Sequence, residues 1–424
     1  MSFVDNLKLK FCHNVFKIRP IIKKIKINSI SGLSFMNLIA AIISFYSISY
    51  FSEIFPKEAF GNYYLATSFF GLTSSLITLN TQFLIFRNKS NEFNFSNSVL
   101  IVGISSLIIA VLNMAFGFLK LNLITGGLFI YIFFTNFFSG LVVLKQSILI
   151  RNSKITKYGF SIVFVAIFSF ILRLVFSNSN SSNSLIFIYF FSTLINYLIV
   201  FNLQDLNIKP YKITQYLLRN KSLFFLRSIQ TFINQANYSG FILFLSNFCS
   251  LGEMAQIGLI STILMIPNMV FGKAGSDFYL SKYSNRTPKL TEWKNDVFKF
   301  SLLSFIAMIT ISLIPENAFK FIFSDLGKNI KINLLAFMPL YLGNLFNKPI
   351  IALINVKGLD NLLARWEVFS TLSKYLILLF LIKHFNVELN IIIFTFSFFS
   401  LLSYFILGIL VRKKEFDFEA SNLH

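Results

Sequence analysis

Twelve long apolar runs separate thirteen shorter polar gaps along this chain of 424 residues. Most of the runs, written as helices, are long enough to cross the roughly 30 Å hydrocarbon core of a bilayer. The chain is 55% hydrophobic and only 13% charged, which is more apolar surface than a globular core of this size would bury. We therefore expect an all-α, polytopic membrane protein with 12 transmembrane helices, over residues 30–52, 59–86, 98–119, 122–144, 158–176, 184–203, 223–246, 254–272, 300–315, 332–356, 366–383 and 389–411.

The Lys and Arg residues alternate between the gaps. Of the 38 Lys and Arg, 28 lie in the odd-numbered gaps, six lie in or next to the even-numbered gaps, and four lie inside the runs. An excess of Lys and Arg marks the cytoplasmic loops of membrane proteins, so both termini are predicted to be cytoplasmic. The net charge of +21 is explained by cations at the inner ends of the spans, where they attract anionic lipid head groups. We therefore expect membrane lipids, not nucleic acid, as partners.

The gaps also suggest a domain organisation. Residues 1–29 carry seven cations and no small-residue cleavage site, so they are predicted to form a basic cytoplasmic arm and not a removed signal. A six-helix bundle is expected over residues 30–203 and a second over 223–411. Between them, 204–222 mix apolar and basic residues and predict a cytoplasmic interfacial linker helix. Residues 412–424 are the predicted cytoplasmic tail.

A weak internal repeat supports two halves. A shift of 195 residues places EAFGNYYLAT, which starts at Glu58, over EMAQIGLIST, which starts at Glu253. The same shift places Arg87 on Lys282, each after a span. Because six spans repeat as six, the halves should have the same orientation and form a 6+6 parallel pseudo-repeat about an axis along the membrane normal.

Polar side chains form stripes on the leading spans of both halves. In the second span they recur at intervals of seven, four and three, which keeps them on one helical face: Thr67, Ser74, Thr78 and Thr81. The seventh span carries a similar set, Arg227, Gln230, Thr231, Asn234 and Tyr238, and the first span offers Asn37. A single hydroxyl is better explained by a hydrogen bond to a neighbouring helix. Whole stripes favour a water-filled cavity between the halves.

Four cations inside the runs narrow the function further: Arg173, Arg227, Lys348 and Lys374. An ionised side chain at mid-bilayer costs about 2.5 to 3.5 kcal/mol even on the lenient insertion scale, so each needs compensation. Arg173 and Arg227 lie near span ends and can snorkel. Lys374 is the most central, with Glu367 on the same helical face. If the four converge, the cavity is electropositive and should hold an anion.

Lys348 has a distinctive setting in the tenth run. It follows Asn344 and Asn347 and precedes Pro349. The missing amide of a proline loosens a helix, so we expect the tenth helix to be loosened near this point, with the two amides lining the cavity.

Signatures of enzymes are absent from the sequence. It contains no phosphate-cradling GxxxxGK and no HExxH, and its three histidines are too scattered for a metal site. We expect no enzymatic activity, no cofactor and no metal. Glu367 is the candidate for coupling to a proton or sodium gradient.

Three segments carry a resemblance to a known family. They are PKEAFGNYYLATSF at the start of the second span, FRNKSNEF at its end, and LGEMAQIGLISTILMIPNM at the start of the eighth. With the twelve-span topology, they make the chain resemble the Wzx-type O-antigen/polysaccharide flippases of the multidrug/oligosaccharidyl-lipid/polysaccharide exporter superfamily.

The resemblance implies a specific transport function. Such a flippase moves an undecaprenyl-diphosphate-linked oligosaccharide, a precursor of O-antigen, lipopolysaccharide or capsule, to the outer leaflet of the bacterial inner membrane by alternating access. The diphosphate would then be the anion held by Arg227, Lys348, Lys374 and Arg173. A polysaccharide polymerase and a chain-length regulator are the implied protein partners.

Two alternatives remain open at this point. A drug or metabolite exporter of the same superfamily is disfavoured by a membrane interior that is rich in cations and poor in acids. A membrane-embedded polysaccharide polymerase or glycosyltransferase would resemble this chain in hydrophobicity. Polymerases of that kind typically carry a large outer loop, however. The longest outer gap here is 316–331.

Overall fold

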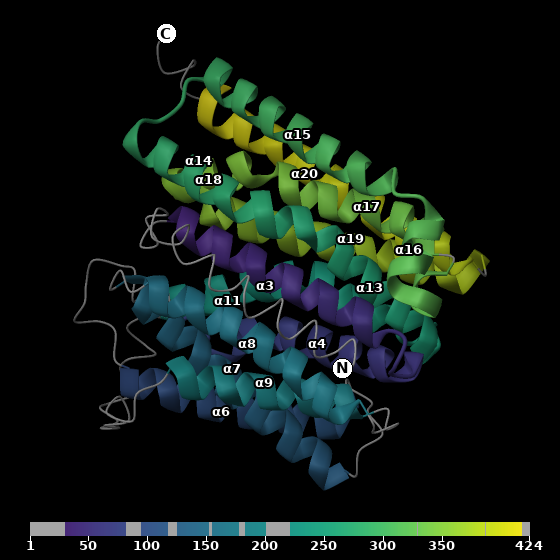
Figure 1. Cartoon of the computed structure of the whole chain (residues 1–424). Helices are drawn as coiled ribbons and strands as arrows, with labels where there is room; N and C mark the ends of the chain where they lie inside the picture. The colour runs from purple at the N-terminus through teal and green to yellow at the C-terminus, as the bar shows by residue number, and fades with distance from the viewer. Residues whose placement is uncertain are drawn as a thin grey trace, which may run out of the picture.

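The computed structural model describes residues 30–81, 95–117, 125–151, 155–177, 183–200, 221–328, 330–385 and 387–417. Within these ranges all regular structure is helical (Figure 1). The first half contains α3 (Ile30–Phe51), α4 (Lys57–Ile77), α6 (Phe95–Phe116), α7 (Thr125–Arg151), α8 (Ile155–Phe176) and α9 (Ser184–Val200).

The second half begins with a rod made of α11 (Lys221–Gln235), the π-helical turn η2 (Ala236–Gly240) and α12 (Phe241–Leu245). A second rod comprises α13 (Leu251–Pro267), the π-helical turn η3 (Asn268–Gly272) and α14 (Lys273–Asn285). The remaining elements are α15 (Leu290–Ser312), α16 (Glu316–Phe323), η4 (Ser324–Gly327), α17 (Ile330–Phe346), α18 (Lys348–Lys357), α19 (Asp360–Phe385), α20 (Leu389–Arg412) and η5 (Lys413–Asp417).

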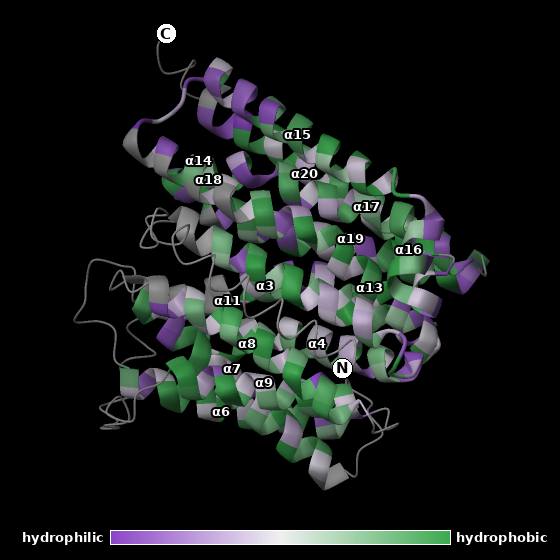
Figure 2. Ribbon diagram, viewed as in Figure 1, coloured by the Kyte–Doolittle hydropathy of each residue, from purple (hydrophilic) through white to green (hydrophobic). Residues whose placement is uncertain are grey.

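Eight helical stretches in the described part of the chain are long and apolar enough to cross a membrane, and two further apolar helices are shorter. Figure 2 shows hydrophobic residues along the length of the helices and hydrophilic ones gathered toward their ends. The chain therefore folds as a multi-pass membrane protein. The predicted total of twelve crossings and the cytoplasmic location of the termini stay predictions.

Elements from the two halves meet in the middle of the molecule. In Figure 1, α6, α7, α8 and α9 lie at one side and α15, α17, α18 and α20 at the other, with α3, α4, α11 and α13 between them. Within the halves, α3 packs on α8 and α17 packs on α20. Between the halves, α4 packs extensively on α13. These two helices begin at corresponding points of the 195-residue repeat.

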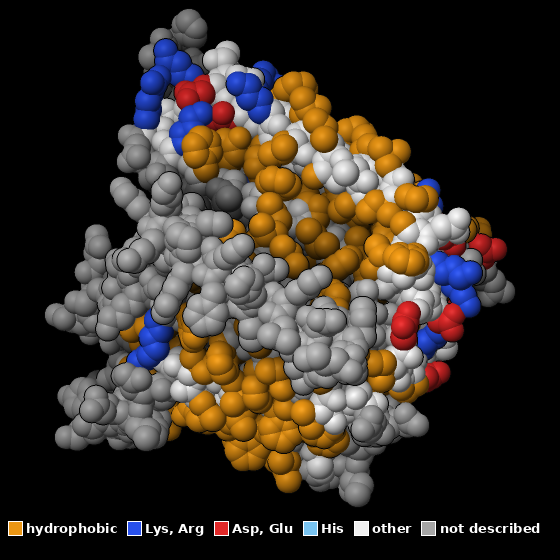
Figure 3. All heavy atoms as spheres, in the orientation of Figure 1, with side chains coloured by type: hydrophobic (Ala, Val, Ile, Leu, Met, Phe, Trp, Pro, Cys, Tyr) orange, Lys and Arg blue, Asp and Glu red, His pale blue; other side chains and the backbone are white. Residues whose placement is uncertain are grey.

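The outer surface of the helices is apolar where a membrane would cover it. Large side chains such as Ile42, Phe160 and Ile306 are more than half exposed. In Figure 3, hydrophobic side chains cover most of the described surface between the two ends of the molecule, and Lys, Arg, Asp and Glu lie toward those ends. Lipid tails are as apolar as these side chains, so the exposure has no cost in a bilayer.

The polar gap between the eighth and ninth expected runs, residues 273–299, is mostly helical. Helix α14 ends at Asn285 and α15 begins at Leu290, ten residues before the run expected at 300–315. Charged groups join the two helices: Lys282 Nζ lies 2.6 Å from Asp296 Oδ2 and 3.1 Å from Glu292 Oε1. These ion pairs hold polar turns in helical form beyond the apolar segment, which hydropathy alone misses.

The tenth run, expected to be a helix loosened near Pro349, is divided into two helices. Helix α17 ends at Phe346 and α18 begins at Lys348, because Pro349 has no amide hydrogen to continue the ladder. The basic arm at 1–29, the linker up to residue 220, Arg87 and the FRNKSNEF segment lie outside the described residues, as do 418–424. The predicted domain division stays a prediction.

Candidate functional site

The seam between α4 and α13 is a direct backbone contact. A Cβ atom added at Gly61 would lie 2.1 Å from the carbonyl oxygen of Leu251, and one added at Gly258 would lie 2.0 Å from the ring of Tyr64. Both distances are far below van der Waals contact, so only glycine allows the helices to approach this closely. The seam is therefore closed at this end of the molecule.

Two hydrogen bonds reinforce the closure at the end that the sequence predicts to face outward. Ser49 Oγ donates to the carbonyl oxygen of Ile322 at 2.6 Å. Ser324 Oγ donates to Glu53 Oε1 at 2.8 Å, from a backbone with φ of +49°. Both bonds join the end of the first span to the α16–η4 segment of the other half. At the opposite end of α4, Asn80 Nδ2 donates to Ser228 Oγ at 3.2 Å.

Two π-helical turns of the second half face helices of the first half. Turn η2 packs against α4, where a Cβ at Gly71 would lie 2.6 Å from Ser239 Oγ, and turn η3 packs against α3. A π turn leaves the regular hydrogen-bond ladder and is frequent at functional sites. Each turn also lies beside one of the lysines singled out in the sequence.

Lys374 occupies the best-defined polar site in the described part of the chain. Its side chain on α19 is only 4% exposed. The ammonium donates to Asn237 Oδ1 of η2 at 2.6 Å and to Ser400 Oγ of α20 at 3.2 Å. It also lies 5.3 Å from the centre of the Phe396 ring, a cation–π distance. The buried charge is thus compensated by oxygen atoms from two elements, η2 and α20, and by an aromatic ring of α20.

The remaining groups of this cluster surround the same turn. Thr371 Oγ1 donates to Asn237 Oδ1 at 3.1 Å, one helical turn before Lys374. Glu367 is buried on the same helix and acts electrostatically on Lys374 and on the Tyr404 and Tyr238 hydroxyls. Glu367 and Lys374 are both buried and lie seven residues apart on α19, which places them on one side of the helix. The role of Glu367 in coupling stays a prediction.

Tyr375 supports the turn from the next position along α19. Its hydroxyl donates to the carbonyl oxygen of Ala236, the first residue of η2, at 2.8 Å. The Tyr375→Phe variant should keep the fold and lose about 1 kcal/mol of stability, because one carbonyl loses its partner. Thermal unfolding in detergent measures this loss. A change as large as that of a Lys374 variant would contradict the assignment of Lys374 as the centre of the cluster.

Lys348 lies at the second π turn. Its Nζ donates to Asn344 Oδ1 at 3.1 Å, so the structure brings these two predicted residues together. A Cβ at Gly272, the last residue of η3, would lie 3.4 Å from Lys348 Cε. Asn347 is buried at the break between α17 and α18. Lys348 thus stands at the irregular part of two spans.

The two arginines have different surroundings. Arg173 is buried in the first half, where Nη1 donates to Ser47 Oγ on α3 at 2.8 Å and the guanidinium lies 5.5 Å from the Tyr63 ring on α4. The backbone of Arg227 lies in α11, but its side chain is outside the described residues. Among the described side chains, Arg173, Lys348 and Lys374 each have their own partners and share none.

The polar stripes divide into two groups. Thr67 and Ser74 donate to carbonyl oxygens of their own helix, at Tyr64 and Gly71, which is the ordinary behaviour of hydroxyls in membrane helices. Thr78 and Thr81 are fully buried at the end of α4, and their hydroxyls have no hydrogen-bond partner within the described chain. Half-buried positions are held by Asn37, Gln230, Thr231 and Asn234. Their lining of a cavity stays a prediction.

Sequence reasoning missed two residues of the Lys374 cluster, Asn237 and Ser400. Asn237 follows the polar stripe of the seventh span by three positions from Asn234, but the π turn shifts the helical phase and turns it toward α19. Ser400 is one of several serines in α20. The one signal in the sequence that could have identified Asn237 is its polar side chain within an apolar segment.

Solved structures with a similar fold are known, although sequence comparisons give no match. No protein-family model matches the sequence, and no curated protein matches it. The lipid II flippase MurJ in an inward closed conformation is similar with a TM-score of 0.71 and 13% identity, covering 90% of this chain and 87% of that one. A multidrug resistance MATE family transporter in an inward-facing conformation has a TM-score of 0.64 and 11% identity, over 90% and 94% of the two chains.

A third similar structure is a eukaryotic MATE transporter, with a TM-score of 0.57 and 14% identity over 90% of this chain and 95% of that one. In each case, about nine-tenths of both chains are superposed. At these identities the likeness is one of architecture. The protein thus has the fold of the MOP superfamily transporters.

Proposed function

We propose that this protein is a flippase that carries a polyprenyl-diphosphate-linked oligosaccharide from the inner to the outer leaflet of the bacterial cytoplasmic membrane. The carried unit would be a precursor of O-antigen or another surface polysaccharide. A polymerase and a chain-length regulator would act next on the exposed product. The protein itself is proposed to be a transporter and not an enzyme, with no cofactor.

The observation that carries this proposal is the buried ammonium of Lys374 beside a turn that packs against the other half. A lysine has three N–H donors, and Asn237 and Ser400 accept from two of them. A substrate phosphate oxygen can take the third, or replace a neutral acceptor with a charged one, which makes a stronger bond. The fold shared with a lipid II flippase supports a lipid-linked substrate.

The position of the cluster suggests how binding and movement are linked. Turn η2 holds Lys374 through Asn237 and touches α4 through Ser239. A phosphate that draws Lys374 away from Asn237 would alter the support of η2, and with it the packing of α4. Lys348, Arg173 and Arg227 would hold the diphosphate in other states of the cycle. Glu367, the one carboxylate buried in the described residues, would couple the change to a proton or sodium gradient.

An exporter of drugs or metabolites is the second candidate, because MATE transporters share this fold. Cationic cargo would require carboxylates in the translocation path. Glu367 lies beside Lys374, whose charge opposes a second cation. The local charge therefore favours an anionic substrate.

The test measures lipid-linked oligosaccharide in a strain that lacks this protein. Single repeat units should accumulate on the inner leaflet, protected from a glycosidase or lectin added outside. The wild-type gene should restore their exposure. The Lys374→Ala variant should not, at equal expression, whereas Lys383→Ala should restore it because Lys383 is exposed on the same helix.

Other results would redirect the assignment. Single units that are already exposed outside would show intact translocation and missing polymerisation, which contradicts a flippase. Unchanged lipid-linked pools together with altered drug resistance would favour the exporter. Full rescue by Lys374→Ala would be consistent with a flippase but would show that Lys374 is not part of its substrate-binding site.

A further inference from the structure

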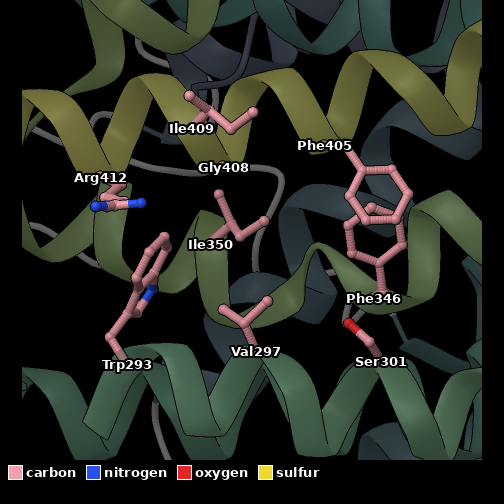
Figure 4. Close-up of a pocket in the computed structure, with 9 residues that line it drawn as sticks. All are labelled: Trp293, Val297, Ser301, Phe346, Ile350, Phe405, Gly408, Ile409 and Arg412. Carbon is pink, nitrogen blue, oxygen red and sulfur yellow. The ribbon is translucent and has the colours of Figure 1, made fainter. Parts of the chain in front are cut away.

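A groove lies on the outside of the second half, between α15, α18 and α20 (Figure 4). It encloses about 190 Å³. Trp293 and Val297 of α15 form one wall, Gly408 and Ile409 of α20 the other, and Ile350 of α18 lies between them. It is distinct from the seam between the halves, where the candidate transport site lies.

The groove has a buried floor and an exposed rim. Ile350 and Trp293 are 2% and 4% exposed, whereas Ile409 is 64% exposed. Gly408 has no side chain to narrow the groove. A Cβ at this position would lie 3.2 Å from Ile350 Cδ1, at the floor of the groove. The rim faces away from the other helices, so in a membrane it faces lipid. Its apolar walls suit a flexible hydrocarbon chain.

One end of the groove is cationic. Arg412, at the last turn of α20, lies beside Trp293 in Figure 4, and Phe405 and Phe346 lie at the opposite end. No carboxylate among the described residues pairs with Arg412, although the nearby Lys357 pairs with Glu415 at 3.1 Å. Lys413 and Lys414 follow and are exposed. Figure 3 shows Lys and Arg gathered at this end of the molecule.

The cationic end matches the level of lipid head groups. Both α15 and α20 are candidate spans, with Trp293 near the start of one and Arg412 near the end of the other. Tryptophan prefers the membrane interface, and the sequence predicts this end to be cytoplasmic. The inner leaflet is the one that carries anionic lipid. An acyl chain in the groove would place its phosphate beside the Arg412 guanidinium.

We infer that this groove is a specific binding site for one anionic phospholipid of the inner leaflet, with an acyl chain against Val297 and Ile350 and the phosphate on Arg412. The bound lipid would fill the space between α15 and α20. The apolar walls match an acyl chain and the cation at one end matches a phosphate, so charge complementarity favours the lipid as the occupant.

The two tryptophans of the chain allow a direct test. The Trp366→Phe variant leaves Trp293 as the only tryptophan, at the groove. The full chain is placed in phosphatidylcholine vesicles that contain the same small fraction of brominated phosphatidylglycerol or brominated phosphatidylcholine. Bromine quenches tryptophan on contact, so the anionic lipid should quench Trp293 more strongly. The added Arg412→Gln change should reduce this preference about fivefold.

Two controls separate a specific site from general attraction to a basic protein. The Lys320→Gln variant removes an exposed charge at the other end of the molecule and should keep the preference. The Trp293→Phe variant leaves Trp366, whose Nε1 is bonded to the Ser403 carbonyl oxygen at 3.0 Å, and should show little preference.

Three results would overturn the inference. Equal quenching by the two lipids would show an apolar groove without head-group selection. No quenching by either would show that protein, such as a second copy, covers the groove. A preference that survives Arg412→Gln, or is as large at Trp366, would show that the charge of the whole molecule and not this site selects the lipid.

Discussion

Replacing Lys374 with Met is expected to destabilise the protein by about 3 kcal/mol and to abolish transport. The side chain is 4% exposed and lies near the buried Glu367. Loss of the ammonium leaves Asn237 Oδ1 and Ser400 Oγ without their donor, and it leaves the buried Glu367 carboxylate without a nearby positive charge. Unsatisfied buried acceptors and an uncompensated buried charge are both destabilising. Met conserves most of the volume, so the loss reports charge and not a cavity. Thermal unfolding in detergent and exposure of lipid-linked oligosaccharide in cells measure the two effects.

A second substitution separates stability from function. In Lys374→Met/Glu367→Gln both charges are gone, and stability should recover by about 1 kcal/mol or more, because no uncompensated carboxylate remains buried. Transport should remain lost, because nothing replaces the ammonium for a diphosphate. Recovery of transport with stability would mean that Lys374 only supports the fold. Lys383→Met, exposed on the same helix, should change neither.

Hydropathy correctly predicts the bounds of those helices that begin and end at the edges of the hydrocarbon core. The runs at 158–176 and 389–411 match α8 and α20 within a few residues, because lipid requires an internally bonded backbone. The expected helix ends are wrong at 273–299, where α14 and α15 extend beyond the apolar runs and Lys282 pairs with Asp296 across the two helices. Such pairing depends on tertiary geometry that an average over one segment does not contain.

The candidate site is less predictable than the helices. Lys374 is identified from the cost of a buried charge, and its neighbour Glu367 from helical spacing. Asn237, its closest partner, depends on the π turn η2. A π turn adds a residue to the helical repeat. A prediction of which residues share a helical face, made at 3.6 residues per turn, is therefore wrong beyond that turn. Thr67 shows the opposite case, because its hydroxyl bonds within its own helix.

Replacing Gly61 with Ala is expected to force apart the ends of α4 and α13 that the sequence predicts to face outward. The new Cβ would meet the backbone of Leu251 at 2.1 Å, and a backbone cannot rotate aside as a side chain can. Overpacking of this kind costs about 1–3 kcal/mol, and here the cost falls on the closed state alone. A 1.4 kcal/mol cost shifts the equilibrium about tenfold toward a state in which the seam is open.

Cysteine labelling measures this shift. Ala255 is fully buried on α13, on the face between Leu251 and Gly258. In a background without Cys12 and Cys249, Ala255→Cys should react about tenfold faster with an impermeant maleimide when Gly61→Ala is present. Gly252→Ala is the matched control, because a Cβ there meets nothing within 4 Å.

Equal labelling in all variants would mean that the α4–α13 seam does not open to the outside. Faster labelling with slower transport would identify the seam as an outer gate that must close in each cycle. Because Gly61 lies on α4 and touches no residue of the Lys374 cluster, such a variant would keep the affinity for the substrate phosphate while losing turnover. Closure and anion binding are then separable, with η2, which contacts both α4 and Lys374, as the element that connects them.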